Sequence, residues 1–135
     1  MRVFLDTNVL VSAVATRGIC ADIFREVLST HTLVTSEALF GEVRRILDQK
    51  LKVPQKTVTE FILLLSENSK STNSAGTSLK ISIDIRDQDD ITILNSALDG
   101  GAEIFITGDK EILTLHQVQA MRIISPRQFW ELIKD

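Results

Sequence analysis

Short apolar runs rich in β-favouring residues alternate along this chain with longer segments in which apolar residues recur every three or four positions. The short runs predict strands and the longer segments predict helices. The predicted strands are residues 3–5, 33–34, 81–83, 104–106 and 122–124. The predicted helices are residues 21–29, 36–49, 57–68, 90–99, 110–115 and 127–133. This alternation is typical of an α/β domain around a mostly parallel sheet, here of about five strands.

Proline and glycine support several of these boundaries. Pro54 and Pro126 stand where two helices are expected to begin, and Gly100 and Gly101 follow the helix at residues 90–99. Residues 69–78 are small and polar, which predicts an exposed loop. Because sequence on both sides of this loop is needed to complete the sheet, we expect one domain spanning residues 1–135.

Composition restricts the location and the partners of the protein. A lone cysteine, Cys20, cannot form an internal disulfide, and the first residues do not resemble a signal peptide. No apolar run approaches the ~18 residues that span a bilayer, so we expect a cytoplasmic protein without a membrane partner. The net charge of −3 gives no general attraction to nucleic acid, so any such contact requires a local basic patch.

Two acidic residues stand at the ends of predicted strands. Asp6 directly follows residues 3–5, and Asp109 closes the segment that begins with the strand at residues 104–106. In open α/β sheets the ligand crevice lies beyond the carboxyl ends of the strands. Both side chains are therefore expected in that crevice.

Two further acids lie on helix faces that are expected to be buried. Glu42 comes three residues after Leu39 and four before Ile46, so it lies within or beside the apolar stripe of its helix. Asp90 lies in the first turn of residues 90–99, on the face that carries Ile93, Leu94, Ala97 and Leu98 and is expected to point inward. Because burial of an unpaired carboxylate is costly, these positions indicate that the charges have a function.

Three of the four acids also have a simpler explanation. Asp90 and Asp109 precede helical runs and would suit an N-cap, which is worth about 1 kcal/mol. Glu42 would be explained by an arginine partner or by a position at the solvent edge of the stripe. One shared site explains all the acids together, whereas the simpler account needs a separate coincidence for each.

A shared crevice of carboxylates requires a cation. The acids repel one another and raise their own pKa values unless a positive ion neutralises them. Mg²⁺ is a hard cation that accepts a few carboxylates together with water and substrate phosphate. Zinc is not indicated, because His31, His116 and Cys20 are isolated and show no ligand spacing.

Four segments also match a known pattern in order. Residues 3–12 read VFLDTNVLVS, residues 36–47 carry Glu42, residues 86–91 read RDQDDI, and residues 106–113 read ITGDKEIL. Together they resemble PIN domains, and more narrowly the toxins of toxin–antitoxin systems that are related to the VapC ribonucleases. The resemblance covers nearly the whole chain and implies a three-layer α/β/α PIN-like domain. It also implies an RNA substrate, an antitoxin protein as partner, homodimerisation, and one or two Mg²⁺ or Mn²⁺ ions.

Carried across position by position, the catalytic and metal-binding acids of the family fall on Asp6, Glu42, Asp90 and Asp109. Asp90 is chosen over its neighbours because the family acid lies eleven residues before a glycine, here Gly101. Asn8 and Thr107 match supporting positions beside the site, and their alternatives are a turn residue and an ordinary strand residue. Asp87 and Asp89, the neighbours of Asp90, either assist the metal or start the helix.

The implied reaction is metal-assisted hydrolysis of an RNA phosphodiester, which needs no nucleophilic serine or cysteine. The candidates for RNA binding are Arg44, Arg45 and Lys110, and Lys50 and Lys52 are also close in sequence. Arg44 and Arg45 lie about 100° and 200° around the helix from Glu42, so they cannot both face the site. A solvated helix face is the alternative for each of these residues.

Two other functions fit parts of the sequence. One is a PIN-like regulatory module that binds RNA or a partner protein without significant turnover. The other is a Mg²⁺-dependent phosphatase with a nucleophilic aspartate, which usually has a second acid two residues later, where this chain has Asn8. Residues 61–65 are all apolar, which indicates either an interface or a buried helix.

Overall fold

The computed structural model describes residues 1–72 and 87–134. Within them the chain forms a six-stranded sheet in the order β3-β2-β1-β4-β6-β5. All neighbouring strands are parallel except the last pair, β5 and β6. The strands are β1 (Arg2–Leu5), β2 (Thr32–Ser36), β3 (Ser69–Thr72), β4 (Ile104–Ile106), β5 (Gln117–Val118) and β6 (Met121–Ile124).

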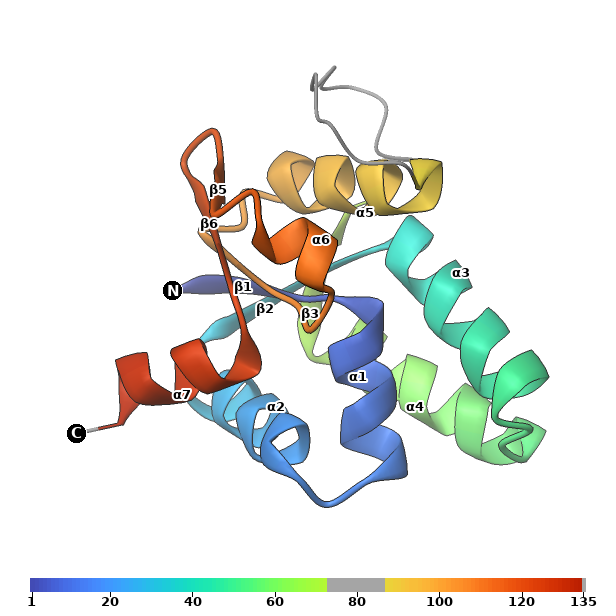
Figure 1. The fold of residues 1–135 in the computed structure, drawn as a ribbon. Helices are drawn as coiled ribbons and strands as arrows, with labels where there is room; N and C mark the ends of the chain where they lie inside the picture. Colours follow the sequence, from blue (N-terminus) through green and yellow to red (C-terminus); the bar gives the residue numbers. More distant parts are fainter. Residues whose placement is uncertain (73–86, 135) are drawn as a thin grey trace.

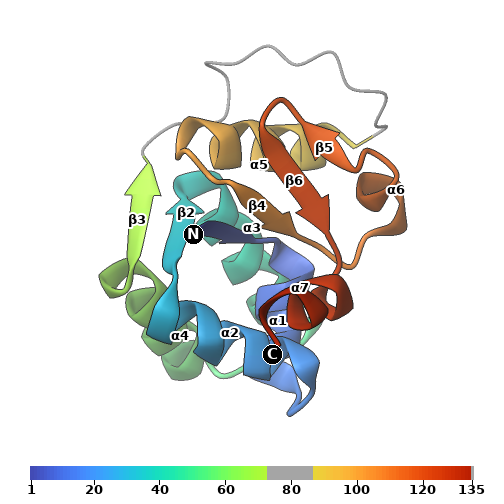
Figure 2. The ribbon, with the colours of Figure 1, turned by 90° about the vertical axis from the view of Figure 1, so that its left-hand side faces the viewer.

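Helices cover both faces of this sheet. They are α1 (Thr7–Ala15), α2 (Ile19–Thr30), α3 (Glu37–Arg45), α4 (Gln55–Glu67), α5 (Gln88–Asp99), α6 (Lys110–Leu113) and α7 (Pro126–Ile133). A π-helical turn, η1 (Ile46–Lys50), extends α3. Figure 1 shows α5 above the strands and α2 and α7 below them, and Figure 2 shows the same layers with the sheet edge to edge across the view. The predicted three-layer α/β/α architecture with a mostly parallel sheet is therefore confirmed.

The centre of the core is the pair of strands β1 and β4. Phe4 and Phe105 are fully buried and their rings stack with centroids 5.3 Å apart. In the parallel register Leu5 lies opposite Ile106, and the Asp6 amide donates to the Ile106 carbonyl at 2.9 Å. The residues that follow both strands therefore emerge at the same edge of the sheet.

Three elements differ from the sequence-based prediction, one of them the two-residue strand β5, which pairs with β6 and was not predicted. Helix α1 was not predicted, because its sequence TNVLVSAVA is rich in β-branched residues that favour strands. Residues 69–72 were predicted as loop but form β3, whose pairing with β2 compensates for their polar composition. The rest of that predicted loop, and the predicted strand at residues 81–83, lie outside the described residues.

Helix ends follow the predicted signals. Pro54 is the N-cap residue of α4, and Gly100 is the C-cap residue of α5. Pro126 begins α7 behind a capping box in which Ser125 and Gln128 satisfy each other's backbone amides.

The apolar residues of α4 are only partly buried. Phe61, Ile62 and Leu65 belong to the core, whereas Leu63 and Leu64 are 52% and 42% exposed. Among the described residues no single helix has the length and apolarity to cross a membrane, although α1 and α2 pass this test as a pair bent by 107°.

Candidate functional site

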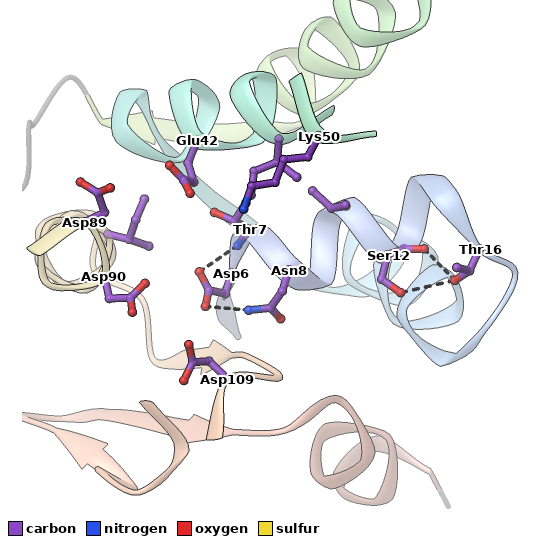
Figure 3. Close-up of a pocket in the computed structure, with 13 residues that line it drawn as sticks. Asp6, Thr7, Asn8, Ser12, Thr16, Glu42, Lys50, Asp89, Asp90 and Asp109 are labelled. Atoms are coloured by element: carbon purple, nitrogen blue, oxygen red, sulfur yellow. Dashed lines mark hydrogen bonds between the residues drawn. The ribbon is translucent and has the colours of Figure 1, made fainter. Parts of the chain in front are cut away.

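A cavity of about 520 Å³ opens at the carboxyl ends of β1 and β4, between α1, α3 and α5. Its volume lies in the range of pockets that bind small ligands. Figure 3 shows acidic side chains pointing into it from three sides. The structure brings together all the acids of the predicted quartet and adds one neighbour, so the acidic lining is Asp6, Glu42, Asp89, Asp90 and Asp109.

Asp6 is the most deeply placed of these acids, with 5% of its surface exposed. It is the N-cap of α1, and its Oδ1 accepts a hydrogen bond from the Thr7 amide at 2.8 Å. Burial raises the pKa of Asp6 above its usual range, although hydrogen bonds from Thr107, Thr7 and Asn8 oppose this effect. The hydrogen bonds therefore fix the orientation of the Asp6 carboxylate, but they do not fully offset the effect of burial on its pKa.

Thr107 and Asn8 hold this carboxylate from the other side. The Thr107 hydroxyl donates to Asp6 Oδ2 at 2.8 Å, and Asn8 Nδ2 donates to the same oxygen at 3.1 Å. Thr107 also accepts from the Asp109 amide at 3.0 Å, and Asn8 Oδ1 accepts from the Gly108 amide at 2.9 Å. These contacts tie the segment after β1 to the segment after β4, which supports the predicted positioning role of both residues.

Asp109 and Glu42 each combine a local contact with a place in the cavity wall. Asp109 is the N-cap of α6, and its Oδ1 accepts from the Glu111 and Ile112 amides at 2.8 and 3.2 Å. Glu42 accepts a hydrogen bond from Arg45 at 2.7 Å, and its side chain is 23% exposed. The simpler explanations for these acids, a helix cap and an arginine partner, thus hold beside their position in the cavity.

Asp90 carries the clearest electrostatic signature of the site. Its pKa is raised from 3.8 to about 7, first by burial and then by the negative charges of Asp87, Asp6, Asp109 and Glu111. Asp87 itself is the N-cap of α5 and accepts from the Asp89 amide at 2.9 Å. A carboxyl group with a pKa this high marks a place where burial and neighbouring negative charges act together.

The donor set fits a hard divalent cation. Carboxylate oxygens from four elements face one cavity, and their mutual repulsion is the kind that such an ion relieves. In the described part of the chain, no three His, Cys, Asp or Glu side chains lie close enough to form a preassembled metal site.

The basic residues proposed for RNA binding are distributed differently from the prediction. Arg44 and Lys110 are exposed and do not line the cavity, and Arg45 is paired with Glu42. Lys50, at the end of η1, is the basic residue that the described cavity wall contains. Lys50 was among the basic residues named as close in sequence, but the RNA-binding prediction was placed on Arg44, Arg45 and Lys110 instead.

Thr7 is another residue whose place the sequence did not indicate. It lies in the cavity wall with 7% of its surface exposed, and its hydroxyl has no hydrogen-bond partner among the described residues. Buried hydroxyl groups are usually paired, so an unpaired one in a cavity wall is unusual.

Comparison with known proteins identifies the fold and the family. A sequence model of the PIN domain matches residues 2–111. No curated protein is significantly similar to the chain in sequence.

Three solved structures with low sequence identity share the fold. VapBC2 from Rickettsia felis, bound to a DNA fragment from its promoter, is 14% identical with a TM-score of 0.66, over 93% of this chain and 98% of that chain. VapC20 from Mycobacterium tuberculosis, a sarcin–ricin loop cleaving toxin, is 15% identical with a TM-score of 0.61, over 89% and 98%. VapBC-1 from nontypeable Haemophilus influenzae is 21% identical with a TM-score of 0.62, over 94% and 99%.

The sequence match covers most of the chain, and the architecture agrees with it. On this evidence the protein belongs to the PIN domain family.

Proposed function

We propose that this protein is an endoribonuclease that depends on Mg²⁺ or Mn²⁺ and acts as the toxin of a toxin–antitoxin pair. One observation carries the proposal: Asp6, Glu42, Asp90 and Asp109 come from separate elements of a PIN fold and line a single cavity. Bringing like charges together lowers the stability of the fold, and a bound cation would remove this repulsion.

Each part of the site has a task in this reaction. When bound, one or two divalent ions would activate water and screen the charge of the phosphate. Asp6, Glu42, Asp90 and Asp109 are the residues that would hold them. Asn8 and Thr107 keep the Asp6 carboxylate in a fixed orientation, so that little reorganisation is needed during the reaction.

The cavity residues do not suggest a covalent mechanism. Thr7, Ser12 and Thr16 are the hydroxyl residues of the described wall, and Ser12 and Thr16 hydrogen-bond to each other. None of them contacts a histidine that would act as a base, since neither His31 nor His116 lines the cavity. Direct attack of water on phosphorus is therefore the reaction that the lining favours.

The partners follow from the toxins that share this fold. VapC20 is described as a toxin that cleaves the sarcin–ricin loop, and the other two similar structures are of VapBC proteins. We infer an RNA substrate, an antitoxin protein as partner, a homodimer and a cytoplasmic location. The exposed Leu63 and Leu64 on α4 provide an apolar surface that is compatible with a protein interface.

Cleavage of labelled single-stranded RNA tests the proposal. The purified protein is incubated with Mg²⁺ or Mn²⁺, and in parallel with EDTA. We expect cleavage that EDTA abolishes, and we expect Asp6→Asn to lower the rate at least about 100-fold, more than the loss of an outer-shell contact. Asp6→Asn keeps the size of the side chain, and thermal unfolding confirms that the variant is folded.

Asp48→Asn is the matched control. Asp48 is exposed on η1 and does not line the cavity, so its substitution removes one negative charge without touching the site. Cleavage that persists in Asp6→Asn, or its absence from the wild-type protein across varied RNAs, would contradict the proposed function. In the second case the regulatory binding module becomes the better account.

A further inference from the structure

The cavity has two chemically different parts. One end carries the acids described above. A second set of lining residues, here called the outer limb, includes no carboxylate among the described residues. They are Val11 and Ser12 of α1, its C-cap residue Thr16, and Ile46 and Lys50 of η1. Figure 3 shows Ser12 and Thr16 to the right of the acids, with the Lys50 side chain extending from its helix toward Thr7.

Lys50 lies in this wall at the end of a π turn. In η1 the Leu51 amide donates to the Ile46 carbonyl at 3.1 Å, a bond across five residues in place of four. Residues spaced by four already lie on one face of a helix. Glu42, Ile46 and Lys50 have this spacing and all line the cavity. Turns of this kind often occur at functional sites.

The ammonium group of Lys50 is available to a ligand. It makes no ion pair within the described residues, whereas Arg45, one turn earlier, is occupied by Glu42. Lys50 is also exposed, so its side chain moves without disturbing the core. A free cation beside an acidic cavity suits a ligand that carries negative charge and extends beyond the acids.

The rest of the outer limb suits a nucleoside. Val11 and Ile46 provide apolar walls, and Ser12 and Thr16 place hydroxyl groups 3.3 Å apart on one side. The Thr16 hydroxyl is further fixed by a 2.8 Å bond to the Ser12 carbonyl. This lining offers contact to a sugar or base face and little capacity to distinguish one base from another.

We propose that Lys50 binds the RNA backbone phosphate next to the one that is cleaved, and that the outer limb holds the nucleoside between these two phosphates. This inference rests on the proposed nuclease function and extends it from the acids to the path of the substrate. Lys50 is a substrate-binding residue in this account and takes no part in the chemistry. Lysine binds phosphate as a point charge on a flexible stem, so Arg at this position is expected to substitute for it.

Binding of RNA in the absence of turnover tests the inference. The probe is a short single-stranded RNA with a 5′ fluorescein, measured by anisotropy in Ca²⁺ over a series of salt concentrations, with a gel to confirm that the RNA stays intact. Wild-type protein is compared with Lys50→Gln, Lys50→Arg and Lys52→Gln. Lys52 is the matched control, because it is an exposed lysine two residues away that does not line the cavity.

The expected result is specific to Lys50. Lys50→Gln should weaken binding about tenfold, as for the loss of one charge-assisted hydrogen bond. It should also reduce the slope of log affinity against log salt by about 0.7, the value for one phosphate contact on a single strand. Lys50→Arg should restore most of the affinity, and Lys52→Gln should stay close to wild type. In cleavage, Lys50→Gln should raise KM more than it lowers kcat.

Two results would overturn the inference: equal binding by Lys50→Gln and Lys52→Gln, or no binding of the probe by the wild-type protein. The failure of the proposed function looks different. A protein that binds RNA through Lys50 but does not cut it with Mg²⁺ or Mn²⁺ retains the phosphate site and loses the nuclease assignment. A protein that cuts RNA while Lys50→Gln behaves as wild type retains the nuclease assignment and loses the phosphate site.

Discussion

A single buried hydroxyl connects two of the acids in the cavity. Thr107 has no exposed surface, donates to Asp6 Oδ2 and accepts from the Asp109 amide. The same atom therefore fixes the orientation of one carboxylate and the start of the segment that carries another. Outer-shell contacts of this kind are part of a metal site even though they do not touch the ion.

Removal of this hydroxyl should damage the site more than the fold. We expect Thr107→Val to lower Mn²⁺ affinity and RNA cleavage by about 10- to 100-fold, because Asp6 loses a donor and the Asp109 amide loses its acceptor. Thr107→Ser keeps the hydroxyl and is expected to retain most of the activity. Titration with Mn²⁺ and cleavage assays measure the effect, and equal losses in the Val and Ser variants would contradict a role for the hydroxyl.

The sequence indicated the acids well and their surroundings less well. Asp6 and Asp109 were recognisable because they follow strands, and the structure confirms that they share a cavity with Glu42 and Asp90. Asp89 was not distinguished from its neighbours, because the choice among adjacent acids depends on which residue caps the helix. The structure assigns that cap to Asp87, which leaves Asp89 and Asp90 to line the cavity.

At the scale of elements, the first turn of α5 concentrates negative charge. Asp87, Asp89 and Asp90 occupy its beginning, where they suit the positive end of the helix dipole. The same turn faces the ends of β1 and β4, where Asp6 and Asp109 lie. The raised pKa of Asp90 is the result, and it predicts how stability depends on pH.

Asp90 should make the metal-free protein less stable as pH rises. Its pKa is raised from 3.8 to about 7 in the folded protein, so the folded state retains a proton that the unfolded chain releases within this interval. Stability therefore falls as pH increases from about 4 to about 7 and is lowest above that range. Asp90→Asn should weaken this fall and raise Tm at pH 8 more than at pH 5.

Thermal unfolding in EDTA across pH 5 to 8 measures this difference, with Asp48→Asn as the control. Added Mg²⁺ should stabilise the wild-type protein more at pH 8 than at pH 5, because the ion binds the ionised carboxylate. If the Tm of Asp90→Asn equals that of the wild type at every pH, ionisation of Asp90 is not the cause of the lower stability at high pH.

Two of the elements that escaped prediction, α1 and β3, did so for physical reasons. The β-branched residues of α1 favour strands in isolation, but the cap at Asp6 and the burial of Val9 and Leu10 in the core override that preference. Strand β3 is short, polar and at the edge of the sheet, so its sequence shows none of the alternation of a half-buried strand. Both depend on contacts with residues far away in sequence.

For the molecule as a whole, the sheet order is what creates the site. β1 and β4 are adjacent although about a hundred residues separate them, as in their pairing of Val3 with Ile104. This brings Asp6 next to Asp109, while α3 and α5 contribute Glu42 and Asp90 from the same end. The alternation of strands and helices predicted this class of fold. The π turn and the position of Lys50 could be found only in the assembled structure.

If these carboxylates form one site for a divalent cation, Mn²⁺ should bind there, and electron paramagnetic resonance detects that binding. Mn²⁺ is titrated at neutral pH into wild-type protein, Asp6→Asn, Asp90→Asn and the control Asp48→Asn, and the free ion is measured. The account predicts saturable binding by the wild type and by Asp48→Asn, with affinity reduced at least about 10-fold in both cavity variants. Equal Mn²⁺ binding by all four proteins, or none by the wild type, would contradict it.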